Sequence, residues 1–174
     1  MKKPALALTA VVIAALISAC GKQTSFITIM GEEYNISTRV LDLSDMGLED
    51  ADIIPLREMT DLSVLRLHIN NITDLSPLAG LTSLTELHLD YNNITDLSPL
   101  AGLISLTELW AGHNQIEDLS PLAGLEDLDL LVLDNNQIKD LTPLAGLINL
   151  YWLDLEGNPV TDWSPVENVV EVIS

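Results

Sequence analysis

Residues 81–102 read LTSLTELHLDYNNITDLSPLAG, and the stretch that follows directly, 103–124, reads LISLTELWAGHNQIEDLSPLAG. The two stretches are identical at fifteen of their 22 positions. Four of the differences are consecutive, because HLDY at 88–91 becomes WAGH at 110–113. Most of the repeat is therefore held to one pattern, and one short segment is free to change.

The same spacing governs most of the chain. A fixed period of this length is typical of a solenoid, in which each repeat packs only against its neighbours. We therefore expect stacked coils around one continuous leucine core. Proline, asparagine and glycine each recur once per repeat, at Pro77, Pro99, Pro121, Pro143 and Pro165, at Asn70, Asn92, Asn114, Asn136 and Asn158, and at Gly80, Gly102, Gly124 and Gly146.

Each repeat begins with a short segment in which apolar and polar residues alternate. Leu87 and Leu89 have the spacing of a strand with one buried face, so both leucines are expected to point into the coil. Asn92 follows the strand, and its amide can bond backbone groups of its own turn and of the next coil. Stacked copies of this asparagine are predicted to form a buried ladder. The outward strand positions are Glu86, His88 and Asp90.

The second half of each repeat carries turn signals. Ser98 can cap a helical turn, Pro99 fits the first helical position, and Gly102 lets the chain leave the turn. Leu100 and Leu103 are expected to face inward. Because this segment is too short for a full helix, we predict a 3₁₀ turn on the convex side. An aspartate precedes each Ser/Thr-Pro and is expected to cap the turn, with calcium binding as the alternative, at Asp74, Asp96, Asp118, Asp140 and Asp162.

The repeated pattern L-x-x-L-x-L-x-x-N-x-I, followed by D-L-S-P-L-A-G-L, resembles the leucine-rich repeat of the 22-residue internalin kind. The resemblance implies an α/β solenoid: a horseshoe arc with short parallel strands on the concave face and 3₁₀ or irregular turns on the convex face. We assign the N-terminal cap and first irregular repeat to residues 27–60, the regular repeats to 61–160 and the C-terminal cap to 161–174. Phe26 to Met30 is expected to form a strand or hairpin that shields the first coil, and Trp163 with the following valines is expected to cover the last one.

The N-terminus differs in kind from the repeats. A basic start, an apolar run from Ala5 to Ala19 and small residues before Cys20 are typical of a secretory signal peptide. The ending Ile17-Ser-Ala-Cys20 resembles the lipobox of bacterial lipoproteins, which implies cleavage of residues 1–19, lipidation of Cys20 and a short tether over 20–26. The alternative is an ordinary signal peptide. Lipidation would place the protein on the outer face of a bacterial membrane, in the cell envelope or at the surface.

The chain carries 7 Lys and Arg against 26 Asp and Glu, a net charge of −19. Such a surface repels phosphate backbones, so we exclude nucleic acid as a partner. Cys20 is the only cysteine, so no disulfide within the chain can support the fold, and packing must do so.

Outward strand positions from successive coils align in columns on the predicted concave face. Leucine and isoleucine already fill the core, so Trp110 and Trp152 are not needed there. We expect both tryptophans to be exposed beside Leu130 and Val132, as an apolar patch ringed by acids. The candidate partner-binding residues are Arg66, His68, Glu86, His88, Asp90, Tyr91, Glu108, Trp110, His113, Leu130, Val132, Trp152 and Asp154.

A protein ligand is the leading interpretation, because internalin-like repeats mediate adhesion and protein binding in the families they resemble. The alternative is a glycan or cell-wall binding module in which the tryptophans are stacking platforms. We expect a monomer. The predicted strand face is smaller than a standard protein interface, so moderate affinity, sharpened by several copies on one membrane, is expected.

Catalytic and metal chemistry has weak support in the sequence. Two adjacent glutamates, Glu86 and Glu108, resemble the carboxylate pair of a glycoside hydrolase, but an open curved sheet offers no enclosing pocket. Three histidines and an aspartate fall on adjacent strands without the fixed spacing of a metal motif. We therefore predict a protein that is not an enzyme and that has no cofactor and no metal site. The histidine group is His68, His88, Asp90 and His113.

Overall fold

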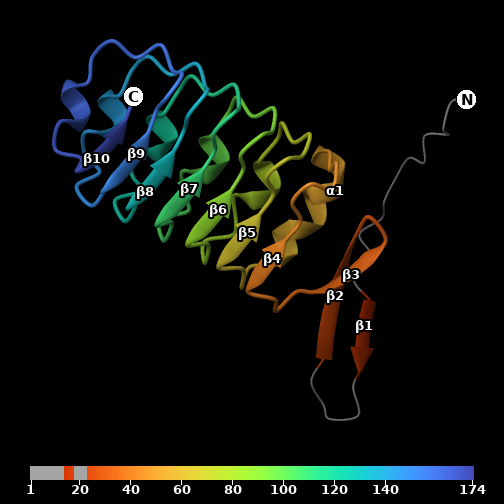
Figure 1. Ribbon diagram of the computed structural model, residues 1–174. Helices are drawn as coiled ribbons and strands as arrows, with labels where there is room; N and C mark the ends of the chain where they lie inside the picture. Colours follow the sequence, from red (N-terminus) through yellow and green to blue (C-terminus); the bar gives the residue numbers. More distant parts are fainter. Residues whose placement is uncertain (1–13, 18–22) are drawn as a thin grey trace, which may run out of the picture.

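The computed structural model describes residues 14–17 and 23–174, and Cys20 with most of the predicted signal peptide lies outside the described residues. From β4 (Val40–Asp42) onward the chain winds as a right-to-left stack of coils in Figure 1, each coil contributing one strand to a continuous sheet. In the described ranges every helix is too short or too polar to span a bilayer.

The main sheet is parallel and has seven strands, in the order β10-β9-β8-β7-β6-β5-β4. Neighbouring strands pair residue for residue, so that Leu65, Leu87 and Leu109 align, each one repeat apart. This confirms the predicted leucine-rich-repeat arc. The strands are β4 (Val40–Asp42), β5 (Val64–Arg66), β6 (Glu86–His88), β7 (Glu108–Trp110), β8 (Leu130–Val132), β9 (Trp152–Asp154) and β10 (Glu171–Ile173).

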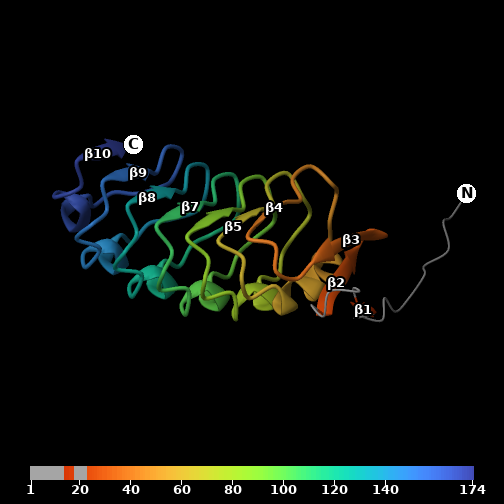
Figure 2. The same cartoon turned by 90° about the horizontal axis from the view of Figure 1, so that it is seen from below.

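Short 3₁₀ helices occupy the side of the coil opposite the strands, as Figure 2 shows. Proline stands in the first turn of each, because its fixed φ suits that position and it has no N–H to leave unbonded. The additional residues of the first coil form α1 (Asp50–Ile53) before η1. The 3₁₀ helices are η1 (Ile54–Glu58), η2 (Ser76–Leu78), η3 (Ser98–Leu100), η4 (Ser120–Leu122), η5 (Thr142–Leu144) and η6 (Ser164–Val166).

The turns before η2 to η6 are capped by aspartate, as predicted for these acids, rather than by serine. Ser98 makes no capping bond of its own; its backbone N–H donates to Asp96 Oδ1 (2.8 Å) and its hydroxyl to Asp96 Oδ2 (2.8 Å). These bonds hold the pKa of the Asp96 carboxyl below its ordinary value. The prediction of a serine cap was therefore wrong, because the longer acidic side chain reaches the backbone two residues ahead and engages the hydroxyl as well.

The asparagine ladder is present, but it bonds backward along the chain. Asn92 Nδ2 donates to the carbonyl of Leu89 in its own coil and to that of Leu67 in the preceding coil, both at 3.0 Å. Asn92 Oδ1 accepts the N–H of Ile72, also in the preceding coil, at 3.0 Å. The predicted bond to the following coil was wrong, because the Asn92 side chain points toward the preceding coil.

An antiparallel sheet of β1 (Ala14–Ile17), β2 (Gln23–Ile29) and β3 (Glu32–Asn35) lies at the N-terminal end, and β1 falls inside the predicted signal peptide. Ile27 and Ile29 on β2 are fully buried and join the leucine core, so the hairpin shields the first coil as predicted. Strand β2 begins inside the predicted tether.

The C-terminal end matches the prediction in part. Val166 is buried, and Trp163 and Val169 pack against the core as expected, but Val170 and Val172 are exposed. Residues 171–173 form β10 parallel to β9, so Val172 extends the sheet by one strand instead of folding over its end.

Candidate functional site

The predicted binding residues on the strands lie side by side on the concave face. The register pairs Arg66 with His88, His88 with Trp110, and Trp110 with Val132 across β5 to β8. A second column runs from Glu86 through Glu108 and Leu130 to Trp152. The sequence columns are therefore real columns in the sheet.

The apolar patch is less exposed than expected. Trp110, Leu130 and Trp152 are each half-buried, and Val132 is only 7% exposed. The expectation of freely exposed tryptophans was wrong, because large side chains on strands one repeat apart lie against each other. The patch therefore presents a closely packed apolar surface and not isolated aromatic rings.

A packed aromatic and charged network lies next to this patch. The His88 ring stacks on Trp110, with ring centroids 5.4 Å apart and planes inclined by 7°. Glu86 Oε1 accepts hydrogen bonds from the Arg66 guanidinium and from His88 Nε2, the latter at 2.9 Å. His68 lies beyond His88, with ring centroids 6.2 Å apart. Each of these side chains is thus held in place by a neighbour from another coil.

Because of this network, Glu86 and Glu108 are not a pair of free carboxylates. Glu86 and Glu108 are paired in register, as predicted, but Glu86 is bound to Arg66 and His88. General acid–base work on a sugar needs two carboxyl groups that face the substrate. The arrangement therefore does not offer the chemistry of a glycoside hydrolase.

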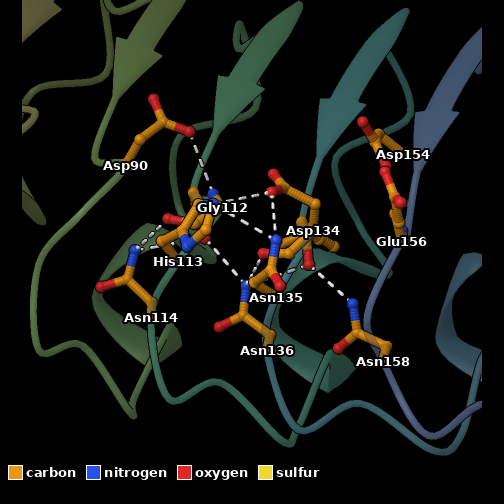
Figure 3. Close-up of polar contacts among 12 residues, drawn as sticks. Asp90, Gly112, His113, Asn114, Asp134, Asn135, Asn136, Asp154, Glu156 and Asn158 are labelled. Atoms are coloured by element: carbon orange, nitrogen blue, oxygen red, sulfur yellow. Dashed lines mark hydrogen bonds and ion pairs between the residues drawn. The ribbon is translucent and has the colours of Figure 1, made fainter.

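Gly112 lies on the concave face between Asp90 and Asp134 of the neighbouring coils. Gly112 donates its N–H to Asp90 Oδ1 at 3.0 Å, and a β-carbon at position 112 would overlap Asp134 Oδ1 (Figure 3). Two carboxylates from different coils thus converge above one stretch of bare backbone. Burial raises the pKa of Asp90 above its ordinary value, against the lowering effect of the bond from Gly112.

No group of three or more His, Cys, Asp or Glu side chains within the described ranges is placed to hold a metal ion. His68 and His88 lie on the strand face, whereas His113 lies at a strand end, where its Nε2 faces Asp134 Oδ2 at 3.2 Å. The fold therefore brings His68 and His88 together and places His113 apart from them.

In each coil from β4 to β9, the residue three positions after the strand has left-handed backbone. Its N–H bonds to the next coil, for example from Ile69 to the Asp90 carbonyl at 2.9 Å. Aspartate, asparagine and glycine adopt this conformation at low cost, whereas a β-branched residue does so only with strain. The residues with positive φ in this column are Asp45, Ile69, Tyr91, His113, Asn135 and Gly157, with φ from 52° to 76°.

Three neighbouring members of this column are bulky and accessible. Tyr91 and His113 stack with ring centroids 4.1 Å apart and planes inclined by 11°. Tyr91 is 54% exposed and Ile69 is 48% exposed. Ile69 was absent from the predicted site. The signal was available, because the same repeat position holds aspartate, asparagine or glycine in other coils.

Replacing Ile69 by asparagine is expected to raise the free energy of unfolding by about 1 kcal/mol, because asparagine tolerates left-handed backbone and isoleucine does not. Chemical denaturation of both proteins measures the difference. Ile104→Asn is the control, since Ile104 is also exposed (63%) but has no positive φ. A gain no larger than that of the control would contradict the role assigned to strain.

The repeats match a known family. Residues 60–102, 82–124 and 104–146 each match the model described as leucine-rich repeats in two copies. No curated protein sequence matches the chain.

Solved structures show the same relation. An internalin (inlF) from Listeria monocytogenes is 41% identical with a TM-score of 0.66, and the match covers 70% of this chain but only 36% of that one. Internalin C2 (inlC2) from the same species is 30% identical with a TM-score of 0.57, and the match covers 83% of this chain and 86% of that one. A leucine-rich-repeat protein of Leptospira interrogans, 24% identical with a TM-score of 0.55 over 68% of this chain and 38% of its own, shares the fold.

The repeating strand, asparagine turn and 3₁₀ helix, together with these matches, define a leucine-rich-repeat solenoid, and the chain belongs to the leucine-rich-repeat proteins. Within that class it is an internalin-like member. Domains of this class are generally protein-interaction modules that present an extended concave surface.

Proposed function

We propose that the chain is an envelope-anchored lipoprotein that binds a protein partner through the concave face of its leucine-rich-repeat domain. The observation that carries this proposal is the apolar patch of Trp110, Leu130, Val132 and Trp152, bordered by the acids Glu108 and Asp154. An apolar centre with aromatic anchors and a polar border is the usual anatomy of a protein interface.

A protein partner is favoured over a glycan by the packing of the aromatic rings. A sugar ring stacks on an accessible aromatic face, but His88 covers one face of Trp110. Trp110 Nε1 is also buried and, within the described part of the chain, has no hydrogen-bond partner, so the indole offers no donor to a sugar hydroxyl. A packed apolar surface of this kind suits side chains of another protein.

Replacing both Trp110 and Trp152 by alanine is expected to reduce recovery of envelope proteins in a pull-down at least tenfold, because truncated aromatic anchors typically weaken an interface by about 2 kcal/mol or more, a factor of roughly 30. Ile148→Ala is the matched control, since Ile148 is a highly exposed apolar residue in the turn after η5. Equal recovery by the double variant and the wild type would exclude the concave face as the binding surface.

The lipid anchor rests on the sequence before Cys20. Cys20→Ser is expected to release the protein from membranes, because two or three acyl chains at about 0.8 kcal/mol per buried methylene provide stable attachment and no other anchor is proposed. Fractionation of cells that express each form measures the effect. Firm membrane association of the serine variant would contradict lipidation, while the pull-down would remain an independent test of binding.

A further inference from the structure

The strand face alone is small for a protein interface. Seven strands at about 4.8 Å spacing span roughly 29 Å, and the short length of each strand adds roughly 10 Å in the other direction. The resulting area of roughly 300 Å² is well below the roughly 800 Å² per partner of a standard interface. A partner that binds the concave face must therefore extend over one flank of the sheet.

The side chains on the flank where the strands begin form hydrogen bonds between coils. The hydroxyl of Ser63 donates to the Arg39 carbonyl at 3.1 Å, that of Thr85 to the Ser63 carbonyl at 3.1 Å, and that of Thr107 to the Thr85 carbonyl at 3.0 Å. These side chains tie each coil to the preceding one, so their hydrogen-bonding capacity is used within the solenoid.

The flank at the strand ends has the opposite character. Ile69, Tyr91 and His113 form a ridge, which we call the strand-end ridge, on three neighbouring coils. None of the three is buried in the core. Each occupies left-handed backbone, with φ of 58°, 55° and 52°, which is strained for isoleucine and tyrosine but is adopted more readily by histidine, asparagine and glycine. Backbone preference therefore does not explain Ile69 and Tyr91, and strained exposed residues of this kind indicate a contact surface.

The charge around the ridge selects the partner. Asp90 precedes Tyr91, Asp134 contacts His113, and Asp45 occupies the same column one coil before Ile69. Among the described strand-face and strand-end positions Arg66 is the only Lys or Arg, and it is bound to Glu86. An arginine or lysine is complementary to this surface, because it can lie against the stacked rings of Tyr91 and His113 and face the carboxylates.

We propose that the strand-end ridge is part of the partner interface and receives a basic protein segment, in which an arginine or lysine contacts Tyr91 and His113 and an adjacent apolar side chain contacts Ile69. This inference rests on the proposed function, since it assumes a protein partner on the concave side. It adds a binding surface outside the strands and the chemistry of the segment that occupies it.

The test uses a random peptide library displayed on phage, selected on the immobilised full chain. Selected peptides are expected to be enriched in arginine or lysine next to apolar residues. They are expected to bind at least tenfold more weakly to the variant Ile69→Asn/Tyr91→Asn/His113→Asn, because asparagine keeps the backbone conformation and removes the contact surface. The Tm of this variant should be no lower than that of the wild type, which separates loss of contact from loss of folding.

Three results would overturn the proposal: peptides that bind the ridge variant as tightly as the wild type, peptides without basic enrichment, or a selection that yields no binders. The Trp110→Ala/Trp152→Ala variant distinguishes binding at the apolar patch from binding at the strand-end ridge. Peptides that depend on the tryptophans but not on the ridge support the proposed function and reject the ridge. Peptides that depend on the ridge but not on the tryptophans support the ridge and reject the apolar patch as the centre of the site.

Discussion

Replacing Asn92 by alanine is expected to lower the free energy of unfolding by about 2–4 kcal/mol, because one buried N–H is left unsatisfied, at a cost of about 1–3 kcal/mol, and two buried carbonyls each lose one hydrogen bond. The N–H of Ile72 loses its only side-chain partner, whereas the carbonyls of Leu67 and Leu89 keep a second bond, from Asn70 and Asn114. Two of the three belong to the preceding coil, so the substitution weakens the junction between coils as well as the turn itself.

Two controls isolate this effect from the general consequence of losing an asparagine. Asn93→Ala changes the adjacent, exposed asparagine and should leave stability within about 0.5 kcal/mol of the wild type. Asn158→Ala removes the corresponding bonds to Leu133, Leu155 and Ile138 near the C-terminal end, where the side chain is only half-buried, and should have a smaller effect. Equal losses at 92 and 93, measured by chemical denaturation, would refute a structural ladder.

Replacing Leu109 by alanine is expected to lower the free energy of unfolding by about 3–4 kcal/mol, through the lost burial of the side chain beyond its β-carbon and the cavity left behind. Leu109 is fully buried in β7, between Leu87 and Leu131 of the adjacent coils. Because a solenoid is stabilised by contacts between neighbours, a defect in a central coil also weakens the coupling between the two halves of the stack.

The same substitution should therefore change the shape of the unfolding transition as well as its midpoint. We expect a lower denaturant m-value or two separate transitions for Leu109→Ala, since the halves can unfold apart. Leu153→Ala on β9 is the matched control: it removes an equally buried leucine but leaves a long uninterrupted stack on one side. If both variants unfold in single transitions with unchanged m-values, the coupling argument fails.

Much of the concave surface follows from the repeat alone. The alternation around Leu87 places Glu86 and His88 outward, and the step of one repeat brings Glu108 and Trp110 beside them. These inferences succeed because strand alternation and coil spacing are local properties, fixed by backbone geometry and by the position of each leucine. The details of the surface depend instead on which side chains meet across coils, and no single repeat contains that information.

The sequence by itself determined the solenoid, the leucine core, the proline turns and the columns of the concave face, because each follows from a periodic pattern in which every repeat is read in the same way. The tertiary structure decided which side chains in these columns contact each other. It stacked His88 on Trp110 and drew Glu86 to Arg66. Aspartate, asparagine and glycine at one repeat position hint at left-handed backbone, but the three-dimensional path of the chain established it and showed that Ile69 occupies this position under strain in an exposed ridge. The physical reason is the same in each case: a period fixes which way a side chain points, whereas its exposure and its partners depend on side chains that lie one full repeat away along the chain.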